Sequence, residues 1–290
     1  MKKFTLILIT CSIFFASNSQ TLDAYRIFSK NGETINFGQM FEELSKHQVI
    51  LFGELHNDPI SHWLQLELTI KLHGKYGEKL ILGAEMFETD NQLILDEYLS
   101  GLISQGRFEA EARLWNNYKT DYKPLVEFAK EKNLRFVGSN IPRRYAAMVS
   151  SGGFESLEKL SEEAKRFISP LPVDYDPELP GYKAMLSMMG MPGKGPSSDN
   201  FPKAQAIKDA TMAWNININL KPENILLHFH GTYHSNNYEG IVWYLNRYRP
   251  NTKIATIATV LQDEVETLSE ESLGLADFII VVPKKMTRTY

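Results

Sequence analysis

Runs of apolar residues alternate along the chain with stretches whose apolar positions have helical spacing. The run from Val49 to Phe52 has no alternating polar positions, which is typical of a strand buried on both faces of a parallel sheet. Asn57 or Asp58 can then cap a helix that accepts Pro59 in its first turn. The spacing of the following apolar residues predicts that this helix continues to Lys75.

The same alternation continues through most of the chain. A hairpin with an Asn31-Gly32 turn comes first, and a short helix over 37–47 leads into the first buried strand. Later strands are predicted at 80–87, 134–140, 225–230, 254–260 and 278–282, and later helices at 91–102, 108–115, 123–133, 204–219 and 238–248. The order predicts an α/β fold, with a mostly parallel β-sheet flanked by helices, in one domain over 20–290.

The alternation lapses over about 152–200. Helices are predicted at 154–168 and 182–191, and the four prolines between Pro170 and Pro180 are expected to exclude regular structure there. A helical and irregular insertion of this length is typical of a lid or binding segment, and it could equally pack over a sheet edge.

The first nineteen residues have the features of a signal peptide. A basic Met1-Lys2-Lys3 start precedes an apolar run to Phe15, and Ser17 and Ser19 supply the small residues of a cleavage site before Gln20. The apolar run is too short for a transmembrane helix. We therefore expect an exported protein of the periplasm or cell envelope.

Cys11 is the single cysteine. It is either a lipidation site, which would allow membrane association only through a lipid anchor, or a small apolar residue of the signal core. Cleavage after Ser19 would leave a chain without disulfides or thiolate ligands. The formal net charge of −4, with no basic stripe, argues against a nucleic-acid partner.

Polar side chains follow three of the predicted strands. Because the carboxyl ends of parallel strands meet at one edge of a sheet, we expect these side chains to converge. His228 and His230 are two apart, so they point to the same face of a strand, and Gly231 is expected to permit a sharp turn before His234. The expected set is Glu54, His56, Glu85, His228, His230 and His234.

These residues have two chemical interpretations. They could ligate a divalent metal through mixed nitrogen and oxygen donors, or they could act as acid–base partners. His62 is expected to be exposed, because it is next to Trp63 on the predicted helix. The predicted metal ligands are Glu54, His56, Glu85, His230 and His234.

Four motifs together resemble a known family. They are Gly53-Glu54-Leu55-His56, Gly83-Ala84-Glu85-Met86-Phe87, the segment Ala204 to Ala213, and His228-Phe229-His230-Gly231-Thr232-Tyr233-His234. In this combination the chain resembles, from about Leu22 to Pro283, the ChaN-like haem-binding lipoproteins, which share a superfamily with the Tiki proteins and the erythromycin esterases. The resemblance implies a role in haem and iron uptake, a homodimer that encloses haem, and a tyrosine iron ligand. It also implies that Glu54, His56, Glu85 and His234 form the polar site.

The tyrosine ligand that the resemblance implies has three candidates in this chain, Tyr175, Tyr182 and Tyr233. The first two lie in the irregular insertion, and the third borders the histidines. Met185, Met188, Met189 and Met191 would suit an adaptable apolar surface over a porphyrin, and Lys194, Arg143 and Arg144 could meet its propionates.

Two functions follow from these observations. One is an exported haem-binding protein of haem and iron acquisition with no chemistry of its own. The alternative is a hydrolase, either metal-dependent with Glu54 or Glu85 as general base, or metal-independent with a histidine–glutamate pair.

Overall fold

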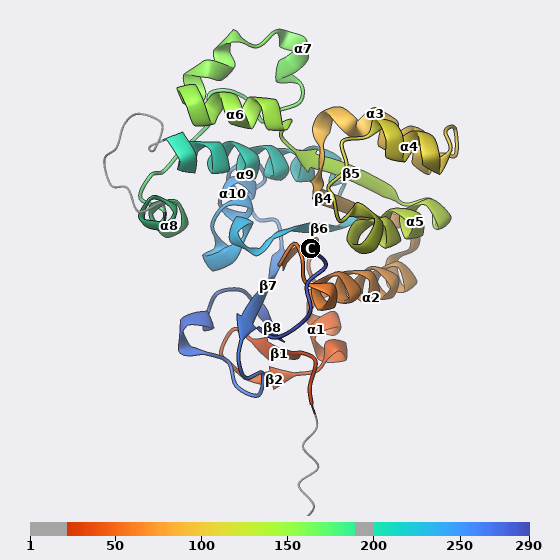
Figure 1. Ribbon diagram of the computed structural model, residues 1–290, viewed down its shortest axis with the longest axis vertical. Helices are drawn as coiled ribbons and strands as arrows, with labels where there is room; N and C mark the ends of the chain where they lie inside the picture. Colours follow the sequence, from red (N-terminus) through yellow and green to blue (C-terminus); the bar gives the residue numbers. More distant parts are fainter. Residues whose placement is uncertain (1–21, 189–199) are drawn as a thin grey trace, which may run out of the picture.

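One eight-stranded β-sheet organises the computed structural model, which describes residues 22–188 and 200–290 (Figure 1). The strands lie in the order β2-β1-β8-β7-β3-β6-β4-β5. Strands β3 to β8 run parallel, and β1 pairs antiparallel with β8 and β2, so the predicted α/β fold is confirmed. Their bounds are β1 Arg26–Ser29, β2 Thr34–Ile35, β3 Val49–Glu54, β4 Leu80–Glu88, β5 Arg135–Asn140, β6 Ile225–Gly231, β7 Ile254–Gln262 and β8 Phe278–Pro283.

Helices cover both faces of the sheet. Helices α1 to α5 pack on one face, and α9 and α10 pack on the other (Figure 1). None of the helices in the described ranges has the length and apolar character needed to cross a bilayer. Their bounds are α1 Phe37–Leu44, α2 Pro59–Tyr76, α3 Gln92–Leu99, α4 Gln105–Glu111, α5 Lys123–Glu131, α6 Arg143–Gly152, α7 Glu162–Lys165, α8 Pro180–Met188, α9 Asn200–Asn219 and α10 Ile241–Tyr248.

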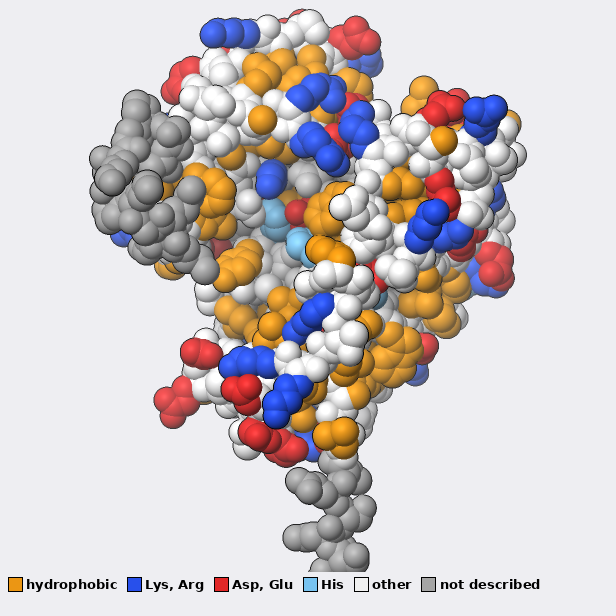
Figure 2. All heavy atoms as spheres, viewed as in Figure 1, with side chains coloured by type: hydrophobic (Ala, Val, Ile, Leu, Met, Phe, Trp, Pro, Cys, Tyr) orange, Lys and Arg blue, Asp and Glu red, His pale blue; other side chains and the backbone are white. Residues whose placement is uncertain are grey.

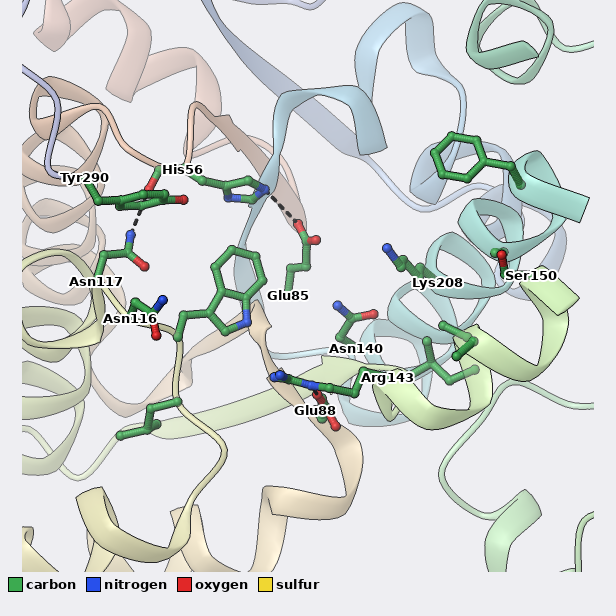
Figure 3. Close-up of a pocket in the computed structure, with 17 residues that line it drawn as sticks. His56, Glu85, Glu88, Asn116, Asn117, Asn140, Arg143, Ser150, Lys208 and Tyr290 are labelled. Atoms are coloured by element: carbon green, nitrogen blue, oxygen red, sulfur yellow. Dashed lines mark hydrogen bonds and ion pairs between the residues drawn. The ribbon is translucent and has the colours of Figure 1, made fainter. Parts of the chain in front are cut away.

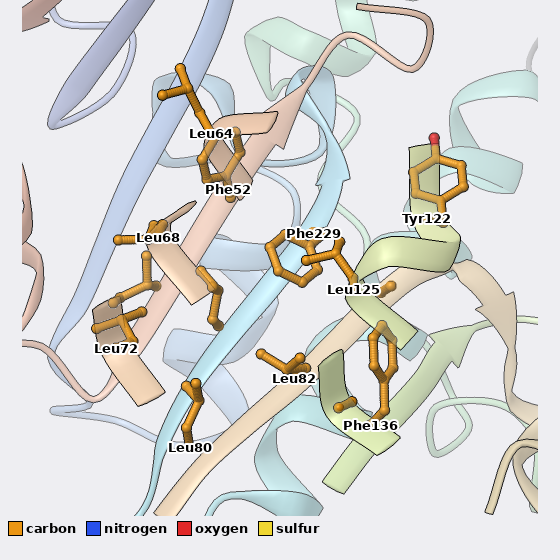
Figure 4. Packing of buried hydrophobic residues seen from close by; sticks show 14 of the residues in the cluster. Phe52, Leu64, Leu68, Leu72, Leu80, Leu82, Tyr122, Leu125, Phe136 and Phe229 are labelled. Carbon is orange, nitrogen blue, oxygen red and sulfur yellow. The ribbon is translucent and has the colours of Figure 1, made fainter. Parts of the chain in front are cut away.

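Strand β3 shows why an unbroken apolar run becomes a central strand. All six of its residues are buried, and it pairs with β6 on one side and β7 on the other. Phe52 packs beside Leu64 of α2 (Figure 4), and Ile50 belongs to the same apolar cluster. Val49 and Leu51 point to the opposite face and belong to the cluster with α9 and α10. Successive side chains of a strand point to opposite faces, so a strand covered on both sides is apolar along its length. The buried Glu54 at the end of β3 is the exception.

The junction between β3 and α2 follows the predicted local signals. Asp58 is the N-cap of α2, its side chain accepts a hydrogen bond from the Ser61 N–H over 2.9 Å, and Pro59 occupies the first turn. The hairpin before it is also confirmed, with Gly32 at a φ of 84° in the turn between β1 and β2.

Several predicted element boundaries are wrong. The helix predicted over 108–115 is α4, which ends at Glu111. The helix predicted over 154–168 is split into a 3₁₀ segment, Phe154–Lys159, and α7, because Ser161 is extended and caps Ala164. Pro180 begins α8, since a proline is tolerated in a first helical turn. Met189, Met191 and Lys194 lie outside the described residues.

A register shift separates the ends of β4 and β5. Ala84 pairs with Gly138, but Glu88 pairs with Asn140, so β4 carries two more residues than β5 over the same interval. Bulges of this kind redirect side chains and are frequent beside functional sites. This one lies between Ala84 and Glu88, and both Glu85 and Glu88 line the same cavity.

Gly53 is required for the packing of β3, which makes it a test of the fold. A β-carbon there would lie 2.8 Å from both the Ile257 carbonyl oxygen and the Thr232 Cα, and neither backbone atom can move freely. We expect Gly53→Ala to lower the free energy of unfolding by about 1–3 kcal/mol. Gly74→Ala is the control because nothing lies within 4 Å of the added carbon on α2, and it should raise stability by about 0.5–1 kcal/mol. Urea unfolding measures both, and equal stabilities would contradict this packing.

Candidate functional site

The carboxyl ends of β3, β6 and β4 are neighbours in the sheet, and they bring four of the predicted residues together. The Nε2 atom of His56 lies 3.9 Å from Glu85 Oε2, and His234 Nε2 lies 3.2 Å from Glu85 Oε1. Glu54 lies behind His56, with their side chains in direct contact. Glu54, His56, Glu85 and His234 therefore form one continuous polar cluster.

Glu54 is buried and holds His56 in one orientation. The His56 Nδ1–H donates to Glu54 over 2.8 Å, the Tyr122 hydroxyl donates over 2.7 Å, and the Gln65 amide donates as well. Burial alone would raise the pKa of Glu54, but the hydrogen bond and the charge of His56 lower it below its ordinary value. Burial opposes protonation of His56, yet Glu54 and Glu85 raise its pKa. The Nε2 atom of a ring held in this way points away from Glu54.

Glu85 belongs to a second chain of buried groups. It accepts the Gly231 N–H over 2.8 Å, and His234 contacts Glu85 through Nε2 and Asp209 through Nδ1. The Tyr182 hydroxyl donates to Asp209 over 2.8 Å. Burial alone would raise the pKa of Glu85 and lower that of His234, but the contact between them reverses both shifts. The pKa of Glu85 falls well below its ordinary value, and Glu85 and Asp209 raise that of His234 to about 10.

His228 and His230 share a strand face as predicted, but both are fully buried. Ser139 donates to the Ala84 carbonyl, so it accepts from His228 Nε2–H over 2.7 Å. The Nδ1 atom of His228 then accepts from His230 Nδ1–H over 3.1 Å, and His230 Nε2 accepts from Ser235. Burial lowers the pKa of both rings, that of His228 to about 3. The two histidines are therefore a neutral structural pair.

One predicted metal ligand, His230, has other partners. Its ring hydrogen-bonds His228 through Nδ1 and Ser235 through Nε2. In the described ranges, no group of three or more His, Cys, Asp or Glu side chains has an arrangement that could hold a metal ion.

Gly231 has a role other than the predicted sharp turn. Its backbone is extended, with φ −60° and ψ 138°, which any residue can adopt. A β-carbon at this position would lie 2.7 Å from His56 Nε2 and 3.0 Å from His56 Cε1. The glycine is needed because the His56 ring lies directly against the backbone of β6.

Two adjoining cavities open onto this cluster. The first, of about 730 Å³, lies between the ends of β4 and β5, the helices α6 and α9, and the segment 114–117, and we call it the Arg143 cavity. The second, of about 640 Å³, lies over the end of β6, and we call it the Tyr233 cavity. Figure 2 shows histidine and acidic side chains at the bottom of a hollow, with Lys and Arg side chains beside it. Both cavities are lined by His56, Glu85, Phe201, Lys208 and Tyr290.

The three candidate tyrosines have different positions. Tyr233 is 61% exposed and lines the Tyr233 cavity, as does Met185. Tyr182 is buried, with its hydroxyl on Asp209, and Tyr175 is half-buried, with its ring against Phe154 and Tyr182. Of the three, Tyr233 lines a cavity.

The predicted cationic residues also differ in whether they line a cavity. Arg143 lines the cavity named after it and pairs with buried Glu88 over 2.5 Å. Arg144 pairs with Asp90 over 2.5 Å. Met188 is in α8, and Lys194 is outside the described residues.

Sequence reasoning missed several residues of the site. Asp209 lies within the 204–213 motif, four residues after Gln205 on one face of α9, and this helical spacing could have indicated it. Tyr122 ends a π-helical turn, Tyr118–Tyr122, which the periodicity did not reveal. His62 was predicted to be exposed, but it is buried between Glu54 and Asp121, because α2 packs over the end of β3.

Tyr290 reaches the site through the last residues of the chain. Arg288 pairs with Asp58 over 2.6 Å, and the Thr289 hydroxyl donates to Asp121 over 2.8 Å. These contacts place Tyr290 beside His56 at the rim of both cavities (Figure 3). The pKa of Tyr290 is raised by burial and by the charges of Glu54 and Asp121.

Comparison with known proteins identifies the family of this site. A family model described as haem-binding uptake, Tiki superfamily, ChaN, matches residues 40–245. The chain belongs to this family. A structure described as cofacial haem binding to ChaN of Campylobacter jejuni is similar over 89% of this chain and 96% of its own, with 20% identity and a TM-score of 0.68. The resemblance predicted from the motifs is therefore confirmed.

Two further structures match less closely. A Bacillus cereus protein is 12% identical over 86% of this chain and 98% of its own, with a TM-score of 0.47. An erythromycin esterase is 11% identical over 89% of this chain and 82% of its own, with a TM-score of 0.48. The search of curated proteins gave no match.

The raised pKa of His234 predicts a pH dependence of stability. A histidine whose pKa rises from about 6.5 in the unfolded chain stabilises the fold fully below that pH, and the contribution is lost as the pH rises toward 10. We expect the difference in unfolding free energy between the wild type and His234→Gln to shrink steadily between pH 6 and pH 10. Urea unfolding across this range measures it. A difference independent of pH, or an NMR titration of His234 near 6.5, would contradict the assignment.

Proposed function

We propose that this protein binds haem as a cargo for haem or iron acquisition, and that the haem lies in the Tyr233 cavity. The observation that carries the proposal is the exposed phenol of Tyr233 at the wall of a cavity of about 640 Å³, opposite apolar side chains. Ligand pockets commonly have volumes of roughly 300–1,000 Å³. The chain's membership of the haem-binding uptake family supports the same cargo.

The donor atoms at this cavity fit haem iron. Tyrosine oxygen and histidine nitrogen are both known axial ligands of haem iron. Tyr233 provides the oxygen, and His56 provides an Nε2 atom whose ring is fixed through the Nδ1–H bond to Glu54. A ligand histidine is normally oriented by such a bond to a carboxylate or carbonyl group. We propose Tyr233 as the iron ligand and His56 as the nitrogen donor beside it.

The walls and the rim also suit a porphyrin. Leu55, Met185 and Phe201 provide apolar contact, and the unbranched thioether of Met185 can adapt to a planar ring. Lys208 lines the same cavity and can pair with a propionate as a point charge.

The location and assembly of the protein are part of the proposal. The basic, apolar and small-residue segments of residues 1–19 support export to the periplasm or cell envelope, with Cys11 as a lipid anchor if it is retained. Phe201 and Tyr233 are exposed apolar side chains beside the cavity, and a second copy of the chain could cover them.

The metal-dependent form of the hydrolase alternative has less support from the geometry. A catalytic metal requires several ligands around one point with an open position. His230 is bonded to His228 and Ser235 instead, and Glu54 is enclosed by His56, Gln65 and Tyr122.

Replacement of Tyr233 tests the proposed ligand. Titration of the purified protein with ferric haem should give a saturable Soret band, and Tyr233→Phe should shift that band and weaken binding at least tenfold, because the iron loses its anionic oxygen donor. Tyr175→Phe is the matched control, since its ring packs against Phe154 and Tyr182 away from the cavities. An unchanged spectrum in Tyr233→Phe would exclude this ligand, and binding without saturation would exclude the haem proposal.

A further inference from the structure

The Arg143 cavity contains a buried hydrogen-bond acceptor with no partner. Asn140 is 8% exposed and lines the cavity, and its Oδ1 atom makes no hydrogen bond to any described residue. Figure 3 shows its amide between Glu85, Arg143 and Lys208. Buried polar atoms normally have a partner, and leaving one without a partner costs roughly 1–3 kcal/mol.

A ligand that satisfies this acceptor must donate a hydrogen bond. A hydroxyl or amine group can do so, whereas the periphery of haem carries apolar substituents and ionised propionates, which only accept. Haem in the neighbouring cavity therefore leaves Asn140 unsatisfied. The Arg143 cavity has the chemistry of a separate ligand.

Two cations, Arg143 and Lys208, line this cavity together with the carboxylates of Glu85 and Glu88. Glu88 and the nearby Asp90 pair with three arginines, Arg113, Arg143 and Arg144, which leaves one positive charge in excess. Glu85 pairs with His234, and Lys208, from α9, adds a further positive charge on the side opposite Arg143.

The amino end of helix α6 adds to the positive charge at this cavity. Its N-cap is Pro142, no side chain caps its first turn, and Arg143 in that turn lines the cavity. The amino end of a helix carries a partial positive charge and unpaired N–H groups, which favour an anion.

We propose that the Arg143 cavity binds a small hydroxycarboxylate. Its carboxylates would pair with Arg143 and Lys208, and its hydroxyl would donate to Asn140 Oδ1. Trp115, Asn116 and Asn117 also line the cavity, where an indole face and amide groups can contact the carbon chain and a further carboxylate. This site goes beyond the haem proposal and does not depend on it.

Citrate and tricarballylate are matched probes for the proposed hydrogen bond to Asn140, because they differ only by the hydroxyl of citrate. Isothermal titration of the haem-free protein should show citrate binding about tenfold more tightly than tricarballylate, as expected for one hydrogen bond to a buried acceptor. Sulfate, which lacks the hydroxyl and the carbon chain, should bind more weakly than either. Equal affinities for citrate and tricarballylate, or no binding of citrate, would overturn the proposal.

Variants locate the binding within the cavity. Asn140→Leu should abolish the preference for citrate over tricarballylate while tricarballylate still binds, and Lys208→Met should weaken both about tenfold. Lys203→Met is the control, since Lys203 is a partly exposed lysine of the same helix that does not line the cavity. If Asn140→Leu fails to fold, the comparison of Lys208→Met with Lys203→Met still tests the site. Equal citrate binding by these two variants would refute it.

Haem titration separates this proposal from the previous one. Asn140→Leu should saturate with haem as the wild type does, because its side chain lines only the Arg143 cavity among the two. Loss of haem binding in Asn140→Leu would show that one ligand spans both cavities, and would overturn the proposal of a separate hydroxycarboxylate site.

Discussion

Burial of two carboxylates at the end of a parallel sheet is the constraint on which this structure depends. Glu54 and Glu85 are 1% and 5% exposed, and an isolated buried charge is very costly. Each is compensated by a histidine and by at least one further donor. Removing one partner from such a pair leaves the other charge uncompensated, so the cluster holds its members in fixed positions.

The compensation is possible because strands and loops approach one another very closely. Gly231 lets the His56 ring lie against β6, and Gly83 lets His228 lie against β4, where a β-carbon would be 2.9 Å from the ring. The buried histidine pair His228–His230 fills the space behind the cluster without adding charge, because its hydrogen bonds to Ser139 and Ser235 suit neutral rings. The buried polar groups at this edge of the sheet are thus of two kinds, the charged cluster that lines the cavities and the neutral pair His228–His230.

The two cavities beside the charged cluster differ in the chemistry of their lining. The Tyr233 cavity combines a phenol and apolar side chains, which suits the proposed haem cargo, whereas the Arg143 cavity combines cations with an unsatisfied amide. His56 and Lys208 line both cavities. A ligand in either one would therefore contact groups that also face the other.

The sequence by itself determined the α/β class, the parallel strands and the family, because apolar periodicity and short motifs are local properties of the chain. It also indicated Glu54, His56, Glu85 and His234, since residues at the ends of parallel strands must share an edge. Tertiary structure alone decided that His230 and His62 are buried, that Tyr122 completes the charge network at Glu54, and that Tyr290 lies beside His56. These outcomes depend on strand order, on the register shift between β4 and β5, and on how helices pack over the strand ends. Such features arise from contacts between residues far apart in the chain, and no local pattern encodes them.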